Sequence, residues 1–534
     1  MKKSIIYASL AALFFSATSC NEEFLETQPT ETVSTPPSQY KLNGLYLMMI
    51  NTGTGGTTGH DDFGQKGYDI FTDMLSADMV LAGVTYGWYS GIANLTWTTD
   101  FTSTRNYTPW RYYYRLINGA NDVIDGLGGN DANPSSAEQR SAMGQAKALR
   151  AYAYFYLLQM FAEKYEPGAA ALPLYTKSGS PAAPKSTQSE VYGQIVKDLT
   201  DAINLLDGFN RANKGMINKY VAEGLLAYTY AAMGDYAKVE QYSKDIITNG
   251  GFSVTSKAES TGGFNSISAP SWMWGFDLTN DNDLDLVSWW GQVDVFSYSY
   301  AWAGDPKSID LGLYAQIKDG DVRKNQFTSV GDIRMLDEHG KPLKDDKGKD
   351  IVEEVYNIPA DAEEGDVIPV EKLFGIDPDK VAYKSIEVLG ISYPAVPANK
   401  FYDPNREIGG QRTITTDYLF MRVDEFHMLY AEALAKQGKD AEAKTALKNY
   451  LANRITNTSY VDALSGTALQ NEIYLQTRIE FWGEGKSYLA MKRNKATIKR
   501  GSNHLFFEGQ SFNYNDSKLT FKIPQDEVNN NPNL

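Results

Sequence analysis

Apolar residues recur at helical spacing in the first half of the chain. Between residues 141 and 165, small or apolar side chains return every three or four positions, at Ala146, Leu149, Ala153, Tyr156 and Met160. This spacing predicts one long amphipathic helix. Pro167 and Gly168 follow directly and predict where it ends.

A second helix is predicted to begin near Thr187. Glu190 follows three residues later, and this pair forms a capping box in which each side chain can bond the other's backbone N–H. Behind it runs a continuous apolar stripe at helical spacing, formed by Val191, Ile195, Leu199, Ala202, Ile203 and Leu206.

Two distant segments resemble each other. Residues 225–247 and 429–451 align without a gap, so that Gly234 meets Gly438 and small alanines coincide. Each segment predicts a helix, a glycine turn and a second helix, as in a tetratricopeptide unit. Helix pairs near both ends of the chain predict a helical scaffold at about 105–250 and 416–500.

The pattern changes between about residues 250 and 415. This stretch is rich in Gly, Pro, Asp and aromatic residues, and its short apolar runs keep no helical period. It predicts loops, short strands and a few short helices. The expected fold is therefore mainly α, with tetratricopeptide-like helical pairs that carry a large loop-rich insert, where binding residues tend to lie.

The N-terminus has the order of an export signal. Lys2 and Lys3 precede an apolar run, and small residues at 16–19 lead to Cys20. The run is shorter than the roughly 20 residues that span a bilayer. We expect residues 1–19 to be a signal peptide.

Cys20 is the only cysteine of the 534 residues, so neither a disulfide framework nor a CxxC zinc site can form. Small residues ending in cysteine resemble a bacterial lipobox, which implies lipidation of Cys20; ordinary cleavage beside an incidental cysteine is the alternative. The polar, proline-bearing stretch that follows predicts a lipidated N-terminus and flexible tether over residues 20–45 and one domain over 46–534. Glu22 and Glu23 resemble a surface-export signal of Gram-negative lipoproteins.

Composition excludes several functions. The formal net charge is −16, so the chain lacks the basic surface that binding to nucleic acid requires. The chain has neither an HExxH motif nor a GxSxG motif. Asp281, Asp283 and Asp285 begin like a calcium loop, but Leu286 and Gln292 replace its glycine and glutamate, which favours a solvated acidic turn. No metal or cofactor is expected.

Several motifs, in order, resemble one family. Residues 420–438, 478–493 and 521–534 are similar to the Arg-x-x-Glu helix opening, the Arg-x-Glu-Phe-x-x-Glu-Gly segment and the terminal Ile-Pro and Asn-Pro-x-Leu of SusD/RagB-like lipoproteins. The stretch around Arg150 and residues 307–324 also fit. Lys486 departs from the pattern, since the family usually has arginine there.

This resemblance implies a lipid-anchored protein of the outer membrane that faces the outside of the cell. It implies that the protein binds oligosaccharides without cleaving them and delivers them to a SusC-like TonB-dependent transporter. Two alternatives remain open. The same fold could capture peptides, or two of the 66 acidic residues could form a lipid-anchored glycosidase.

Two aromatic stretches are candidate sugar-binding segments, because a sugar ring stacks on flat aromatic faces beside polar side chains. The first, residues 85–97, offers Trp88, Tyr89 and Asn94. The second, residues 288–302, offers Trp289, Trp290, Tyr298 and Trp302. Each ring could instead be core. The Trp289–Trp290 pair is favoured, because neighbours on a strand point to opposite faces and seldom are both buried. Trp272 and Trp274 are expected in the core.

Overall fold

The computed structural model describes residues 37–282, 284–372, 383–396, 400–404, 406 and 415–534. The export signal, Cys20 and the tether as far as residue 36 therefore lie outside the described residues. No helix in the described part of the chain combines the length and the apolar character needed to cross a membrane.

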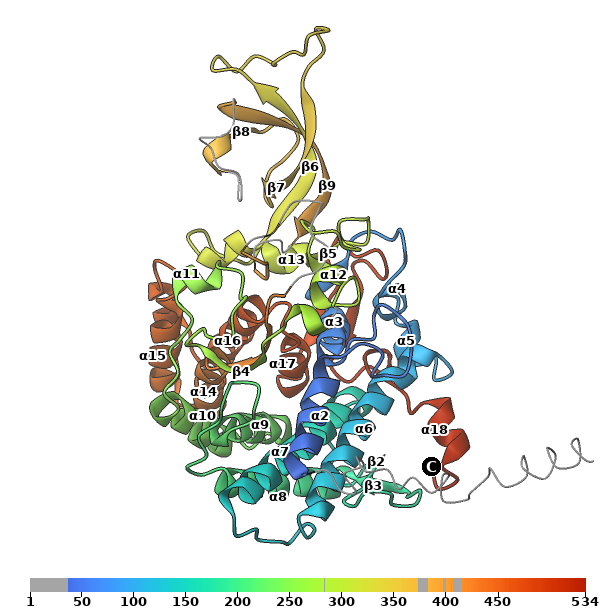
Figure 1. The fold of residues 1–534 in the computed structure, drawn as a ribbon. Coiled ribbons are helices and arrows are strands. Elements are labelled where there is room, and N and C mark those ends of the chain that lie inside the picture. The colour runs from blue at the N-terminus through green and yellow to red at the C-terminus, as the bar shows by residue number, and fades with distance from the viewer. Residues whose placement is uncertain (1–36, 283, 373–382, 397–399, 405, 407–414) are drawn as a thin grey trace, which may run out of the picture.

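Long helices dominate the structure (Figure 1). The longer ones are α2 (Ser38–Ile50), α3 (Gln65–Leu75), α6 (Thr104–Gly126), α7 (Ala137–Phe161), α8 (Gln188–Leu205), α9 (Lys219–Met233), α10 (Tyr236–Asn249), α14 (Asp424–Lys436), α15 (Asp440–Leu451) and α16 (Gly466–Glu480). The shorter ones are α4 (Ser90–Ala93), α5 (Thr96–Thr99), α11 (Lys257–Ser260), α12 (Trp289–Val293), α13 (Leu311–Tyr314), α17 (Ser487–Arg493) and α18 (Gln525–Asn530).

Within the described residues, the strands form four two-stranded pairs and one four-stranded sheet. The pairs are β1 (Met79–Leu81) with β5 (Lys307–Ile309), β2 (Ala170–Pro173) with β3 (Lys185–Thr187), β4 (Trp272–Phe276) with β10 (Tyr418–Arg422), and β11 (Thr497–Lys499) with β12 (Ser511–Asn513). The larger sheet has the order β7 (Val352–Pro359), β6 (Thr328–Leu336), β9 (Ser385–Val396), β8 (Val367–Pro369).

The helices stack as predicted. Helix α7 packs between α6 and α8, and the series continues through α9 and α10 to α14 and α15. The capping box is present, since the Thr187 side chain accepts from Glu190 N and the Glu190 side chain accepts from Thr187 N. The mainly α, tetratricopeptide-like scaffold is confirmed.

The two similar segments lie next to each other. Their helix pairs are α9–α10 and α14–α15, and α10 packs against α14 although about 180 residues separate them in sequence. Gly234 and Gly438 occupy equivalent turns of the two helix pairs. Their φ angles are 81° and 74°, values that residues with an L side chain seldom adopt. The insert therefore interrupts one continuous helical array.

Helix α2 corrects the prediction for the tether. It begins at Ser38, inside the stretch expected to be tether, and packs against α6. Leu42, Leu45 and Met49 are buried and lie on one face of the helix. A continuous run of apolar residues at 45–50, which includes the exposed Leu47, hid its period. The prediction of a tether was wrong for residues 38–45.

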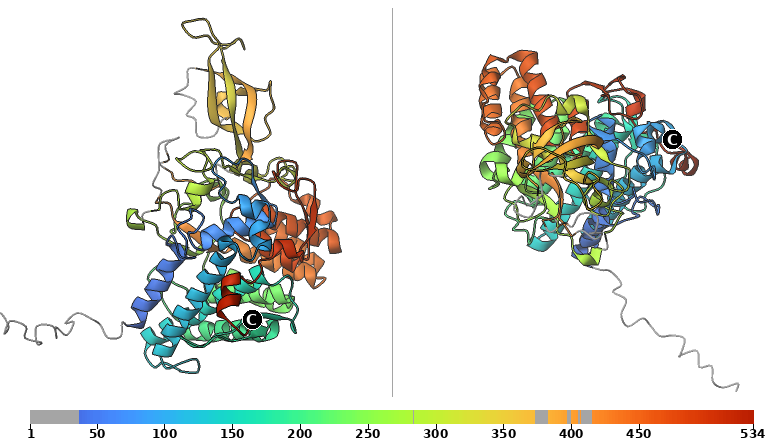
Figure 2. Two further views of the ribbon diagram at one scale, coloured as in Figure 1. Left: turned by 90° about the vertical axis from the view of Figure 1, so that its right-hand side faces the viewer. Right: turned by 90° about the horizontal axis from the view of Figure 1, so that it is seen from above.

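The insert contains more sheet than its short apolar runs predict. Strands β6, β7 and β9 have 9, 8 and 12 residues, and their sheet projects from the helical body (Figures 1 and 2). Register shifts interrupt the pairing of β6 with both neighbours, so strict alternation is lost in the sequence. The sheet has a small hydrophobic cluster of its own around Ile333, Ile358 and Val388.

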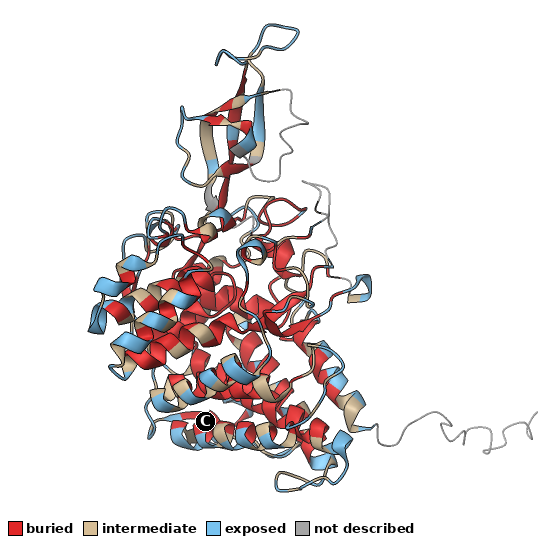
Figure 3. Cartoon of the chain, turned by 90° about the vertical axis from the view of Figure 1, so that its left-hand side faces the viewer, coloured by how far each residue is buried: buried red, intermediate tan, exposed pale blue. Residues whose placement is uncertain are grey.

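Buried residues fill the helical body and the base of the projecting sheet (Figure 3). Trp272 and Trp274 on β4 are each 1% exposed, as predicted for core residues. Beside them the body contains a large buried cluster of charged side chains.

We call this cluster the ion network. Its cations are Arg323, Lys400, Arg422 and Arg454, and its carboxylates are Asp321, Asp424, Glu480 and Glu484. Every one of these eight side chains is at most 3% exposed. Four positive and four negative charges balance, as burial of charges in a low dielectric requires.

Arg422 and Glu480 are at the centre of the ion network. The Arg422 guanidinium contacts Glu484 at 2.9 Å, Glu480 at 2.9 Å and Asp424 at 3.1 Å. Glu480 also accepts from Arg454 at 2.9 Å and from Arg323 at 3.2 Å. The network therefore joins β10 and α14 to the end of α16 and to the residues that follow α15.

The network also holds both ends of the projecting sheet. Arg323 precedes β6 and Lys400 follows β9. Both bind the same residue, since Arg323 donates to the Glu480 carboxylate and Lys400 Nζ donates to the Glu480 carbonyl at 2.9 Å. The excursion thus leaves the body and returns to it at one buried point.

Replacing Glu484 tests the ion network. Burial alone would raise the pKa of Glu484, but Arg422 and Lys400 hold it at about 2, below the roughly 4.3 of an unfolded glutamate. The ionised group therefore stabilises the fold above pH ~4.3, and this contribution is lost as the pH falls towards 2. We expect Glu484→Gln to lower the free energy of unfolding at pH 7 by about 3–5 kcal/mol, because it leaves buried cations unpaired.

Chemical unfolding followed by circular dichroism at pH 7 and at lower pH measures this effect. The difference between wild type and Glu484→Gln should shrink as the pH falls below ~4. The exposed residue Glu508 provides the control, since Glu508→Gln should leave stability unchanged. A loss below about 1 kcal/mol for Glu484→Gln at pH 7 would contradict the assigned role.

Candidate functional site

A short antiparallel strand pair brings the two aromatic stretches together. Strand β1 pairs with β5 so that Leu81 lies opposite Lys307. In an antiparallel pair the residues after one strand run beside the residues before the other. Residues 82–89 therefore lie against residues 298–306, more than 200 positions away in sequence.

Asp305 links these two loops through hydrogen bonds. Its buried carboxylate accepts backbone N–H groups of Thr85, Tyr86 at 2.9 Å and Trp88 at 3.2 Å. The neighbouring Lys307 is fully buried, which lowers its pKa to about 7, and its Nζ donates to the Asp305 carbonyl at 2.9 Å. A charged acceptor with several donors fixes the path of the 85–88 backbone.

Four rings meet at this junction, and we call them the aromatic cluster: His60, Tyr86, Trp88 and Tyr300. Tyr86 and Trp88 present their rings at steep angles to Tyr300, with centroids 5.2 and 5.7 Å away. His60 stacks on Trp88 at 5.2 Å, with an angle of 2° between the planes. Tyr86 is 63% exposed, and His60 and Trp88 are partly exposed.

His60 reaches the cluster from a glycine-rich loop, residues 51–60. The Asp62 carboxylate shapes that loop by accepting from Gly55 N at 2.8 Å and Thr57 N at 2.9 Å, and burial raises the pKa of Asp62. Gln292 on α12 donates to the His60 carbonyl at 2.8 Å. His60 Nδ1 lies 2.7 Å from the Tyr300 hydroxyl, which leaves Nε2 as the ring atom that can meet a ligand.

A cation near Trp88 is already paired. Arg105, at the start of α6, forms two 2.9 Å hydrogen bonds with Asp61, and its Cζ is 5.9 Å from the Trp88 ring centre. Gly59 permits this contact, because a Cβ there would lie 2.1 Å from the Arg105 guanidinium. The charges of Arg105 and Asp61 therefore offset each other.

Three of the predicted residues belong to this region. Trp88 is in the aromatic cluster, and Tyr298 and Trp302 form a neighbouring ring pair with centroids 5.7 Å apart. Tyr298 is 39% exposed and Trp302 is partly exposed. These three rings can present a face to a ligand.

Two predicted residues of the first stretch have structural contacts. Tyr89 is fully buried with φ of 67°, a left-handed conformation that turns its ring inward beside the outward-facing Trp88. Asn94 is partly buried, and its Oδ1 accepts from Thr96 N at 3.0 Å and Thr96 Oγ1 at 2.7 Å. That carboxamide oxygen therefore closes a turn before α5.

The Trp289–Trp290 pair differs from expectation. The two residues begin helix α12, not a strand, and each is 2% exposed. Trp289 packs on Phe401 with centroids 4.7 Å apart, and Trp290 stacks on Tyr418 at 4.9 Å. The inference that both could not be buried was wrong, because neighbouring helical side chains can reach two different walls of one core.

Of the four rings, sequence reasoning missed His60. Tyr86 and Tyr300 lie inside the two predicted stretches. His60 ends a glycine-rich loop, which was the available signal. Its contact with Tyr300 spans 240 positions, and such a separation leaves no local pattern.

Tyr86, Trp88 and His60 are exposed or partly exposed above the buried Tyr300, and such ring faces suit stacking against the C–H face of a sugar. Among the described residues, no group of three or more His, Cys, Asp or Glu side chains is placed to hold a metal ion. Asp283 of the acidic turn lies outside the described residues.

Comparison with protein families identifies the chain. A family model described as "Starch-binding associating with outer membrane" matches residues 23–230, and a model of the SusD family matches residues 390–534. The chain belongs to the SusD family. The two matched ranges leave residues 231–389 unmatched, which is most of the insert.

Relatives and solved structures agree with this membership. A SusD-like protein P25 of Formosa agariphila is 26% identical over 223 residues, and a SusD-like protein of Bacteroides ovatus is 26% identical over 162 residues. These matches cover 39% and 28% of this chain and only 40% and 29% of the two relatives.

The fold is similar over nearly the whole chain. A SusD-like carbohydrate binding protein of Bacteroides vulgatus has a TM-score of 0.68 at 23% identity, over 93% of this chain and 96% of its own. Surface glycan-binding protein A of Bacteroides thetaiotaomicron, solved with laminarihexaose, has a TM-score of 0.60 at 16% identity, over 92% and 97%.

Asp305 can be tested as the residue that orders the 85–88 loop. We expect Asp305→Ala to speed hydrogen exchange of residues 85–88 by about tenfold or more, because hydrogen bonds to a charged group contribute about 1.5–3 kcal/mol. Hydrogen–deuterium exchange with mass spectrometry measures this. The exposed residue Asp281 provides the control Asp281→Ala. Unchanged exchange at residues 85–88 in Asp305→Ala would show that other contacts order the loop.

Proposed function

We propose that this SusD-family protein captures oligosaccharides at the cell surface and does not cleave them. The observation that carries the proposal is the aromatic cluster, together with the adjacent Tyr298–Trp302 pair. Rings from three distant segments meet on one surface, and Tyr86 is 63% exposed. A soluble protein rarely gathers exposed rings without a binding partner.

The chemistry of the cluster suits a sugar. The faces of Tyr86 and Trp88 offer stacking surfaces for C–H groups, and His60 Nε2 and the Tyr86 hydroxyl can hydrogen bond to sugar hydroxyls. Arg105 beside Trp88 is already paired with Asp61, so this cation is not available to an acidic sugar. The complex of Surface glycan-binding protein A with laminarihexaose supports this ligand class.

We further propose an outer-membrane location and a transporter partner. Residues 1–19 would direct export, the lipid on Cys20 would anchor the protein facing outward, and the residues from the start of α2 to 534 would act as one domain. The bound oligosaccharide would pass to a SusC-like TonB-dependent transporter. The family description, which names association with the outer membrane, supports the location.

Replacing Trp88 tests sugar capture. We expect the chain from Asn21 onward to bind at least one of laminarihexaose, maltohexaose, cellohexaose, xylohexaose and mannohexaose in isothermal titration calorimetry. Trp88→Ala should weaken Kd about tenfold or more, because a lost stacking contact of about 1.4 kcal/mol corresponds to a factor of ten. Tyr86→Ala should weaken it in the same direction.

A matched control and a parallel assay make the result decisive. Tyr40 on α2 is 69% exposed, similar to Tyr86, and Tyr40→Ala should leave Kd unchanged. If neither Trp88→Ala nor Tyr86→Ala lowers the affinity or the number of sugars bound per protein, the cluster is not a sugar site. Failure of every glycan together with binding of an oligopeptide pool would indicate peptide capture, and release of reducing ends would identify a glycosidase.

Replacing Cys20 tests the anchor. In cells, the wild-type protein should incorporate radiolabelled palmitate and fractionate with the outer membrane, because two or more acyl chains give stable anchoring. We expect Cys20→Ser to lose the label and the membrane association. Since Cys20 is the only cysteine, label retained in the variant would rule out thiol-linked lipidation at this residue.

A further inference from the structure

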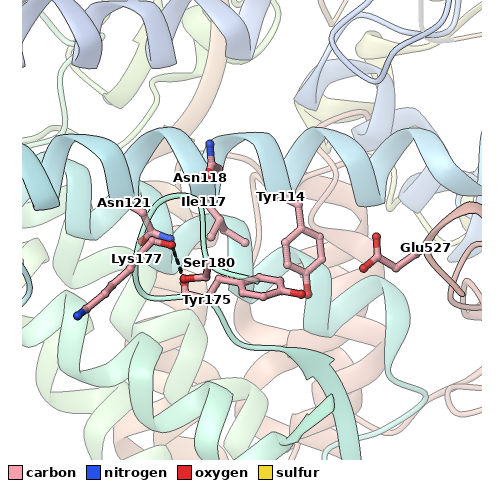
Figure 4. A pocket seen from close by; sticks show the side chains of 8 residues that line it. All are labelled: Tyr114, Ile117, Asn118, Asn121, Tyr175, Lys177, Ser180 and Glu527. Atoms are coloured by element: carbon pink, nitrogen blue, oxygen red, sulfur yellow. Dashed lines mark hydrogen bonds between the residues drawn. The ribbon is translucent and has the colours of Figure 1, made fainter. Parts of the chain in front are cut away.

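A hollow in the surface lies away from the aromatic cluster. It has a volume of about 270 Å³ and is lined by Tyr114, Ile117, Asn118, Asn121, Tyr175, Lys177, Ser180 and Glu527. Figure 4 shows the rings of Tyr114 and Tyr175 in its centre, with the Glu527 carboxylate on one side and Asn121 and Ser180 on the other. We call it the α6 pocket.

Three segments that are distant in sequence line the α6 pocket. They are helix α6, residues 174–184 between β2 and β3, and the C-terminal helix α18. Asn121 Nδ2 donates to the Tyr175 carbonyl at 3.1 Å and fixes the loop on α6. The chain terminus holds the other side, since Asn531 and Asn533 donate to the carbonyls of Ala183 and Ala182, each at 2.9 Å. Hydrogen bonds between these segments therefore hold the walls of the pocket in place.

The two tyrosine rings are fixed in place. Tyr114 donates its hydroxyl to the Pro173 carbonyl at 2.8 Å, and the Tyr175 hydroxyl accepts from Ala183 N at 3.2 Å. The rings meet at 71° with centroids 5.9 Å apart. Both side chains are only partly buried, so they form a right-angled aromatic corner that faces the hollow.

Polar groups surround this corner. Asn118 Oδ1 accepts from Gly179 N at 3.3 Å. Its amide Nδ2 can therefore donate a hydrogen bond to another group. The Lys177 side chain is exposed. One oxygen of Glu527 accepts from Trp110 Nε1 at 3.3 Å, and the other can accept from a ligand. Donors and acceptors thus lie beside ring faces, the combination that sugar hydroxyls and C–H faces require.

The pocket continues into a shallower groove of about 550 Å³. The groove shares Tyr114, Asn118 and Glu527 with the pocket and runs between α2 and α6, where the partly exposed Tyr107 adds aromatic surface. The combined space is in the range of ligand sites of roughly 300–1,000 Å³. It can accept more than one sugar residue.

This place is distinct from the aromatic cluster. Figure 1 has β2, β3 and α18 in the lower half of the body, whereas α4, β5 and α12 lie in the upper half. Helix α6 links the two places, because Arg105 at its start lies by Trp88 and Asn118 lies 13 positions later, which is roughly 20 Å along the helix axis.

We propose that the α6 pocket is a second oligosaccharide-binding site. A peptide is the less suitable occupant, because peptide grooves offer pockets for apolar side chains. Among the described residues, Ile117 is the one aliphatic residue that lines the pocket, and it is buried. The groove adds the buried Leu45 and the partly buried Met48. The inference does not require the aromatic cluster to bind sugar, because the two surfaces share no residue.

Filling the pocket tests this proposal. Ser180 is exposed on the loop, so Ser180→Trp should block the pocket and leave the fold intact. Ser189→Trp, exposed on the first turn of α8 outside the pocket, provides the matched control. Lys177→Ala beside Lys185→Ala gives a second pair that leaves the pocket open.

Hydrogen–deuterium exchange distinguishes the two sites. At about ten times Kd of a hexasaccharide from the panel above, we expect exchange at residues 174–182 to slow about tenfold. This protection should persist in Trp88→Ala and disappear in Ser180→Trp, while Ser189→Trp retains it. Lys177→Ala should reduce it, and Lys185→Ala should not.

Each outcome separates this inference from the proposed function. Protection of residues 85–88 without any change at 174–182 would overturn the second site and leave the aromatic cluster as the sugar site. Protection at 174–182 that Trp88→Ala abolishes would also overturn it. Protection confined to 174–182 would support the pocket while contradicting the proposed role of the cluster. Protection by oligopeptides alone would contradict sugar binding at both.

Discussion

Burial of balanced charge is the constraint on which the rest of this structure depends. Eight charged side chains lie in the body with almost no exposure to water, and each requires its partners in place. Because those partners come from five separate segments, none of the segments can shift without leaving a charge unpaired. A purely apolar core would tolerate small displacements, whereas the ion network accepts one arrangement of β10, α14, α16 and the two ends of the projecting sheet.

This constraint explains why the fold could be predicted from sequence. The motifs that resemble the family include those that supply the network. Arg422 ends β10 and Asp424 opens α14, Glu480 ends α16 and Glu484 follows it, and Asp321 and Arg323 lie near the end of residues 307–324. Arg150 of the earlier motif forms its own buried pair with Asp198 at 2.6 Å. Lys486, where the family usually has arginine, still contacts Glu425 at 3.4 Å, so the departure keeps the charge. Helical period and paired charges together define the scaffold.

The candidate site was less predictable because its rings meet through long-range pairing. The aromatic stretches are visible in sequence, but which ring faces water depends on details without periodic signal. A left-handed Tyr89 turns one ring inward beside an outward Trp88, and a short helix in place of a strand buries both Trp289 and Trp290. His60 enters from a loop whose shape depends on the buried Asp62. The aromatic composition indicated the two stretches, but contacts between distant segments determine which of their rings are exposed.

The attachment of the projecting sheet has an evolutionary consequence. Arg323 and Lys400 both bind Glu480. The residues between them therefore form a loop whose two ends are anchored next to each other. The entropy of closing such a loop rises only slowly with its length, so residues between these anchors can lengthen, shorten or be exchanged at little cost to the scaffold. Selection could thus remodel this projection, beside the aromatic surface, while the buried anchors stay constant. One helical frame could in this way carry many different outer surfaces.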